Sequence, residues 1–94
     1  MSKTVVIQIG NSDDKLKQSE WSVFVSLIDE KVREIAYQVH FSGHSYGAAI
    51  WQNACWVIEM EESFVPFFLK ELTLIRERFK QDSVAVTIGE SIFG

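Results

Sequence analysis

Cysteine and proline are nearly absent from this sequence, which holds one of each. Cys55 alone cannot form an intrachain disulfide, so a disulfide-stabilised secreted domain is excluded and a reducing, cytoplasmic compartment is expected. No apolar run approaches the ~20 residues needed to cross a bilayer. The first four residues lead straight into a strand-like segment without the apolar core of a signal peptide. These features predict a soluble cytoplasmic protein that has no membrane partner.

Basic residues are also scarce: nine Lys and Arg stand against thirteen Asp and Glu, for a formal charge of −4. Affinity for nucleic acid comes mainly from clustered cations, whereas the cations here are interleaved with acids. An RNA-binding sheet further needs aromatic residues on its first and third strands, and the first predicted strand offers none on its open face. We therefore expect no nucleic-acid partner. The charge balance permits a neutral or basic protein partner.

What the sequence does contain is apolar residues, at 47% of 94 positions. A chain of this size buries roughly 60 to 65% of its unfolded surface, enough for one modest core without metal or disulfide support. We find no low-complexity segment and no internal repeat. The sequence therefore predicts a single globular domain over residues 1–94.

The N-terminal third predicts a strand followed by a helix. Val5, Ile7 and Ile9 alternate with Thr4, Val6 and Gln8, the period of a strand. Turn-forming residues follow from Gly10, and Ser19 is the expected helix N-cap. Residues 20–36 then predict an amphipathic helix because its apolar residues share one stripe. That stripe holds Trp21, Phe24, Val25, Ile28, Val32 and Ile35.

Residues 37–60 predict a β-hairpin closed by a Gly-rich turn. The first arm alternates Tyr37, Val39 and Phe41 with Gln38, His40 and Ser42. The second arm, residues 49–60, is long and apolar, so it is expected inside the sheet, with Ile50, Ala54, Trp56, Ile58 and Met60 on the covered face. A turn centred between Ser45 and Tyr46 would pair His40 with Trp51 and Gln38 with Asn53.

The last third predicts a helix and a strand. Ser63 is the expected cap of the helix and Pro66 fits its first turn. Its buried stripe is predicted to hold Phe64, Phe68, Leu72, Ile75 and Phe79. Gln81 and Asp82 are expected to end this helix. A final strand follows, in which Val84, Val86 and Ile88 alternate with Ala85 and Thr87.

The resulting order is β-α-β-β-α-β. With right-handed crossovers, this order most simply gives a four-stranded antiparallel sheet with both helices on one face, the α+β arrangement called ferredoxin-like. The first and third strands are then central, in keeping with the apolar second arm of the hairpin. This fold supports many unrelated activities, so function has to be argued from specific surfaces.

Residues 43–47 match the G-x-S-x-G pattern, in which a strained turn between a strand and a helix presents a nucleophilic serine. That motif belongs to parallel sheets in much larger domains, whereas here it joins two strands of a hairpin. A flexible Gly-rich turn is therefore the better interpretation, and no catalytic residue is predicted.

Metal and cofactor sites are also not expected. His40, His44 and Cys55 are possible ligands, but residues four apart across a hairpin tip do not converge as they do on a helix. A half-buried His40 packed on Trp51 is the simpler interpretation. Cys55 is predicted to be an unreactive mid-strand residue. Asp13, Asp14, Glu59, Glu61 and Glu62 are predicted to be solvated charges and helix-dipole partners.

The sheet face turned away from the helices is the predicted contact surface. It is expected to carry Val6, Gln8, Gln38, His40, Trp51 and Asn53, with Trp51 as the anchor. An exposed apolar sheet face is uncommon in a monomer and usually marks a partner site. Ile92 and Phe93 near the C-terminus either extend the last strand over the domain's own edge or cross to a second copy.

Two functional hypotheses follow. The first is a non-enzymatic adaptor, regulator or inhibitor that binds another protein, itself, or both through this face, as a homodimer. The alternative is a small-molecule enzyme or sensor with a pocket between sheet and helices, lined by Trp21, Trp51, Trp56, His40 and Asn53. A cavity of ~300 Å³ into which His40 or Asn53 points would favour the alternative. A filled core with a flat outer face would favour the first hypothesis.

Overall fold

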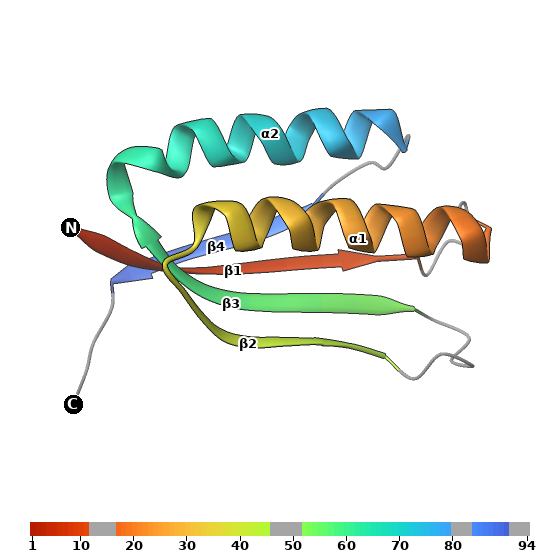
Figure 1. Ribbon diagram of the computed structural model, residues 1–94, viewed down its shortest axis with the longest axis horizontal. Coiled ribbons are helices and arrows are strands. Elements are labelled where there is room, and N and C mark those ends of the chain that lie inside the picture. The colour runs from red at the N-terminus through yellow and green to blue at the C-terminus, as the bar shows by residue number, and fades with distance from the viewer. Residues whose placement is uncertain (12–16, 46–51, 80–83, 91–94) are drawn as a thin grey trace.

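A computed structural model of the chain describes residues 1–11, 17–45, 52–79 and 84–90. It is an α+β fold with a four-stranded antiparallel sheet and two α-helices (Figure 1). The elements are β1 (Ser2–Gly10), α1 (Gln18–Ile35), β2 (Gln38–His44), β3 (Asn53–Glu61), the 3-10 turn η1 (Glu62–Phe64), α2 (Val65–Arg78) and β4 (Ala85–Glu90). The predicted order of strands and helices is therefore confirmed.

The sheet has the strand order β2-β3-β1-β4, so β1 and β3 are central as predicted. β1 pairs with β3 over its whole length, from Ser2 opposite Glu61 to Gly10 opposite Asn53. Both helices lie on the same side of the sheet (Figure 1). The other side of the sheet carries no helix of the described chain.

The core fills the space between the helices and the sheet. Its members are the predicted inward residues of β1 and β3 together with the apolar stripes of both helices. They are Val5, Ile7, Ile9, Trp21, Phe24, Ile28, Val32, Ala54, Trp56, Ile58, Met60, Phe68 and Leu72. The indole N–H of Trp56 donates to Oδ1 of Asp29 on α1 at 2.9 Å, so the polar atom of this buried ring has a partner. The predicted covered face is confirmed for Ala54, Trp56, Ile58 and Met60, and Ile50 lies outside the described residues.

The start of α1 differs from the prediction by two residues. Lys17, not Ser19, precedes the first helical turn, and the Glu20 carboxylate accepts a hydrogen bond from the Lys17 backbone N–H at 3.0 Å. This bond satisfies one of the donors near the helix start that have no partner within the helix. The predicted stripe is confirmed: Trp21, Phe24, Ile28 and Val32 are buried.

The predicted hairpin register is wrong. Gln38 lies opposite Glu59 rather than Asn53, and His44 lies opposite Ala54. The prediction centred a tight turn between Ser45 and Tyr46, within residues 43–47, but Gly43 and His44 continue β2, and β3 begins only at Asn53. The backbone N–H of Ser45 bonds to the carbonyl of Asn53 at 2.8 Å, which closes the last pair before the connection. The connection is thus longer than the Gly-rich pattern indicated.

A register shift in β2 also changes the face on which Phe41 lies. Val39 is opposite Ile58 and Phe41 is opposite Val57, so His40 is the extra residue of a β-bulge. Strict alternation predicted Phe41 on the helix side, together with Val39. The bulge instead turns Phe41 to the side without helices, where its side chain is 55% exposed.

The beginning of α2 differs as well. Ser63 does not cap the helix, because it lies inside η1, and Phe64 occupies the cap position of α2. Phe64 is 52% exposed, so its predicted place in the buried stripe is wrong. Phe68 and Leu72 are buried as predicted, with Ile75 and Phe79 packed partly against the core. α2 ends at Arg78, and the predicted end at Gln81 and Asp82 lies outside the described residues.

A set of side-chain amides joins the end of β1, the start of α1 and the start of β3. Gln52 and Asn11 are 6% and 2% exposed. The Gln52 carbonyl oxygen accepts from Gln18 at 3.0 Å and from Asn11 at 3.3 Å, and the Gln52 amide donates back to Gln18 at 2.8 Å. Because buried amides without partners are costly, these bonds stabilise the junction of the three elements.

Candidate functional site

The side of the sheet that carries no helix of the described chain is the predicted contact surface, and we call it the open face. The strand pairings arrange its side chains in three rows across the sheet. One row holds Gln38, Glu59, Thr4 and Gly89; the middle row holds Phe41, Val57, Val6 and Thr87; the third holds Gly43, Cys55, Gln8 and Ala85. The centre of the open face is therefore apolar or small, with polar groups around it.

Phe41 is a large aromatic residue of this surface within the described strands. A methyl group built on Gly43 would approach Cζ of the Phe41 ring to 2.7 Å, closer than real carbon atoms come. The ring therefore lies over Gly43, two residues along the same strand. Glycine permits this position because it has no side chain. The result is a half-exposed ring held close to the backbone of β2.

Glu59 occupies the middle of the polar row and is 1% exposed, so its prediction as a solvated charge is wrong. Thr4 from β1 donates its hydroxyl to Oε1 of Glu59. Nε2 of His40 lies 3.2 Å from the same oxygen. A carboxylate buried in this way requires hydrogen-bond donors, and two neighbouring strands supply them.

His40 reaches Glu59 because of the bulge. Gln38 is the residue directly opposite Glu59 in the register, and His40 is the unpaired residue beyond it. The imidazole is 30% exposed while the carboxylate is 2% exposed, so the histidine covers the acid from the solvent side. The predicted contact of His40 with Trp51 cannot be placed, because Trp51 lies outside the described residues.

The structure brings together some of the predicted partner-binding residues and separates others. Val6 and Gln8 lie in the middle of the open face, with Gln38 and His40 at one end beside Glu59. Asn53 lies opposite Gly10 at the other end of β3. Six residues along a strand separate it from Glu59, a distance of about 20 Å. Trp51, Ile92 and Phe93 lie outside the described residues.

Two features of the surface were not predicted: the position of Phe41 on it and the burial of Glu59. The signal for Phe41 was Gly43, because a glycine inside a strand often marks a bulge or a close approach. The signal for Glu59 was a single acid within the apolar run Val57-Ile58-Glu59-Met60 of a central strand. Neither signal specifies which residue the side chain contacts, because that residue lies on another strand or on the other side of the bulge.

The G-x-S-x-G segment shows no nucleophile geometry in its described part. Gly43 and His44 end β2, an antiparallel strand. The Ser45 hydroxyl oxygen accepts from the backbone N–H of Asn53 at 3.0 Å, and Nδ1 of His44 lies 2.9 Å from the Ser45 carbonyl oxygen. The imidazole therefore bonds to the backbone and not to the serine hydroxyl.

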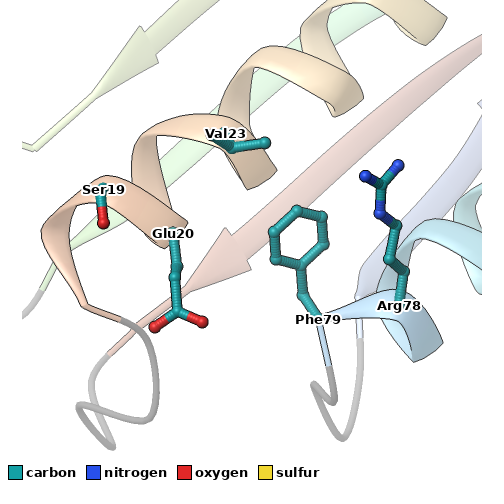
Figure 2. A pocket seen from close by; sticks show the side chains of 5 residues that line it. All are labelled: Ser19, Glu20, Val23, Arg78 and Phe79. Atoms are coloured by element: carbon teal, nitrogen blue, oxygen red, sulfur yellow. The ribbon is translucent and has the colours of Figure 1, made fainter.

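A surface cavity of about 410 Å³ lies between the first turn of α1 and the end of α2 (Figure 2). Ser19, Glu20, Val23, Arg78 and Phe79 line it. In Figure 2 the Phe79 ring stands between the Glu20 carboxylate and the Arg78 guanidinium, so the two charges do not converge on one point. Phe79 also packs on Phe24 with ring centroids 5.1 Å apart, which ties this ring to the core.

Two further cavities, of about 370 and 250 Å³, lie between α2 and β4 and beside the end of β2. Neither His40 nor Asn53 lines any of these three cavities. In the described part of the chain, no three His, Cys, Asp or Glu side chains gather where they would bind a metal ion. Within the same residues, neither helix has the length and apolar character needed to span a bilayer.

The sequence matches no protein-family model, and no curated protein is significantly similar to it.

Proposed function

We propose that this chain is a non-enzymatic interaction protein that binds another protein through its open face. The observation that carries the proposal is Phe41, an aromatic side chain that is 55% exposed and lies over Gly43. Rigid aromatic anchors with small, half-buried neighbours are the typical centres of binding energy in protein interfaces. Val57 and Val6, beside Phe41 in the middle row, supply such neighbours.

The composition of the open face indicates the chemistry of the partner. Its middle row is apolar or small, and the exposed amides of Gln38 and Gln8 lie in the rows on either side of it. The acid of the polar row, Glu59, is buried and already accepts hydrogen bonds, so it adds little charge to the surface. A partner with a flat apolar centre and hydrogen-bonding groups around it would match this arrangement.

We also propose that the fold is ferredoxin-like. The strand order β2-β3-β1-β4 and the placement of both helices on one side support a ferredoxin-like topology. In this arrangement the helices protect one face of the sheet and leave the other for contacts. We place the protein in the cytoplasm, because a single cysteine suits a reducing compartment.

The filled core favours this function over the alternative of a small-molecule enzyme or sensor. Thirteen hydrophobic side chains of the described residues are buried between sheet and helices, including Trp21 and Trp56, which were expected to line a pocket. His40 is turned to the open face, where it contacts Glu59. Of the residues proposed for a ligand pocket, Trp56 therefore packs in the core and His40 lies on the open face. Trp21 is buried but also borders the 250 Å³ cavity, and Trp51 lies outside the described residues.

Affinity purification from the native host, with quantitative mass spectrometry, tests the proposed function. The baits are the full chain, Phe41→Ala and the matched control Phe67→Ala, whose phenylalanine is 52% exposed on α2. A partner of the open face is recovered with wild type and Phe67→Ala and lost with Phe41→Ala. Truncating a central aromatic anchor costs about 2 kcal/mol or more, so the Kd of the purified partner rises about 30-fold. Equal binding by all three baits would contradict the proposal.

A further inference from the structure

The two histidines of the chain both lie in β2, and different acceptors hold their rings. Nε2 of His40 lies 3.2 Å from Oε1 of Glu59 on the open face. Nδ1 of His44 lies 2.9 Å from the carbonyl oxygen of Ser45, and His44 borders α1 on the helix side. A neutral imidazole has one N–H and one bare nitrogen, and the hydrogen bond made by one nitrogen decides which is which. Each histidine can therefore be assigned a tautomer.

The acceptor at His40 is a buried carboxylate. The Glu59 side chain is 2% exposed, and its Oε1 also accepts the hydroxyl hydrogen of Thr4. Two donors on one oxygen are typical of an ionised carboxylate, which offers only lone pairs, so Nε2 of His40 carries the hydrogen. His40 is thus held as the Nε2–H tautomer, and its Nδ1 is bare. The Ser45 carbonyl gives His44 the opposite tautomer, Nδ1–H.

Nδ1 of His40 is a hydrogen-bond acceptor that the described chain does not use. The imidazole makes its one hydrogen bond among these residues through Nε2. Its side chain is 30% exposed and directly precedes Phe41, the proposed aromatic anchor. An acceptor beside an anchor favours a partner that supplies a donor, because a partner that lacks one would leave the acceptor desolvated without a hydrogen bond.

The cations of the chain lie away from the open face. Every Lys and Arg of the described residues belongs to or adjoins α1 or α2, except Lys3. Lys3 is opposite the buried Met60 in the register, so it lies on the helix side of β1. The three rows of the open face hold no Lys or Arg. A chain of formal charge −4 therefore presents a cation-free side to its partner, which favours a neutral or basic surface over an acidic one.

We propose that the partner of the open face is a neutral or basic protein that donates a hydrogen bond to Nδ1 of His40, with Glu59 as the residue that positions the imidazole. This inference rests on the proposed function and names what the partner must supply: a hydroxyl, an amide or a cationic N–H, but not a carboxylate. A second copy of the chain suits the site less well, because it would oppose one cation-free face with another.

Long-range proton–nitrogen NMR correlations of the full chain test the tautomers without a partner. At a pH where both imidazoles are neutral, His40 is expected as Nε2–H and His44 as Nδ1–H, so each ring is the control for the other. Glu59→Ala is expected to remove the preference of His40 and to leave that of His44. An Nδ1–H tautomer at His40 in the wild type would overturn the inference.

Calorimetric titration tests the donor, with the protein that the wild-type bait recovers and Phe41→Ala loses. His40→Gln places an amide nitrogen the same number of bonds from Cα as Nε2, so it can still donate to Glu59, but it has no acceptor at the position of Nδ1. Its Kd is expected to rise about tenfold, because the partner's donor loses its acceptor. The matched control His44→Gln, on the helix side, is expected to leave the Kd unchanged.

The outcomes separate this inference from the proposed function. If Phe41→Ala loses the partner and His40→Gln binds it as tightly as wild type, the inference is wrong and the proposed function stands. If no recovered protein depends on Phe41, the open face is not the site and both proposals are wrong. A wild-type dimer that Phe41→Ala dissociates, as measured by light scattering, would also overturn the inference, since a second copy would then cover the open face.

Discussion

Ile58 and Glu59 are neighbours in β3, both are buried, and they lie on opposite faces of the sheet for different reasons. Ile58 is covered by apolar side chains beneath the helices. Glu59 is on the face without helices, where Thr4 and His40 surround its carboxylate. Burial on the helix face depends on matching shapes, whereas burial on the open face depends on hydrogen bonds. A residue's low exposure therefore does not tell which kind of interaction stabilises it.

The largest expected effect is on the helix side. Ile58→Ala is expected to lower the free energy of unfolding by about 2 to 5 kcal/mol, because it leaves a cavity in a packed core. Val57→Ala, on the half-buried open face, is expected to cost about 1 kcal/mol, since fewer neighbours lose contact there. Urea denaturation of both variants measures the difference. Equal losses would show that the open face is packed as tightly as the core.

An intermediate effect is expected for the buried acid. Glu59→Ala is expected to cost about 1 to 3 kcal/mol, because Thr4 and His40 lose their common acceptor. Glu59→Gln keeps an oxygen that can accept one of these bonds and is expected to cost less. The control is Glu62→Gln, whose carboxylate is 55% exposed and whose pair with Lys3 spans 3.9 Å. It is expected to change stability by less than about 0.5 kcal/mol. A similar cost for the two Gln variants would contradict a structural role for Glu59.

The smallest effect on stability is expected at Gly43. In Gly43→Ala the added methyl group displaces the Phe41 ring, at an expected cost below about 1 kcal/mol, because the ring is exposed and can move. A double-mutant cycle isolates this contact: the cost of Gly43→Ala should vanish when Phe41 is already Ala. A cost that is independent of Phe41 would show that Gly43 serves the backbone and does not position the ring.

Much of the fold could be predicted because it depends on local periodicity. The 3.6-residue stripe predicted α1 and its buried residues, and the two-residue alternation predicted the inward faces of β1 and β3. Both central strands alternate without interruption through their mutual pairing, so each side chain takes the predicted face.

The hairpin and the site depend on contacts between distant residues and could be predicted only in part. One extra residue at His40 reverses the alternation that follows it, and Phe41 moves to the open face. The burial of Glu59 needs a donor 55 positions earlier, at Thr4, and periodicity gives no information on that pairing. Val6 and Gln8 were placed on the correct face because β1 has no bulge.

Because of the bulge, His40 is an extra residue in β2 that the sheet accommodates without a change in the pairing of Val39 and Phe41. A chain lacking only this residue would run from Val39 to Phe41 with unbroken alternation, opposite Ile58 and Val57 as before. Loss of a residue elsewhere in β2 would instead shift the following side chains to the wrong side. Position 40 is therefore where this strand can change its length in evolution, at the expense of one donor to the carboxylate of Glu59.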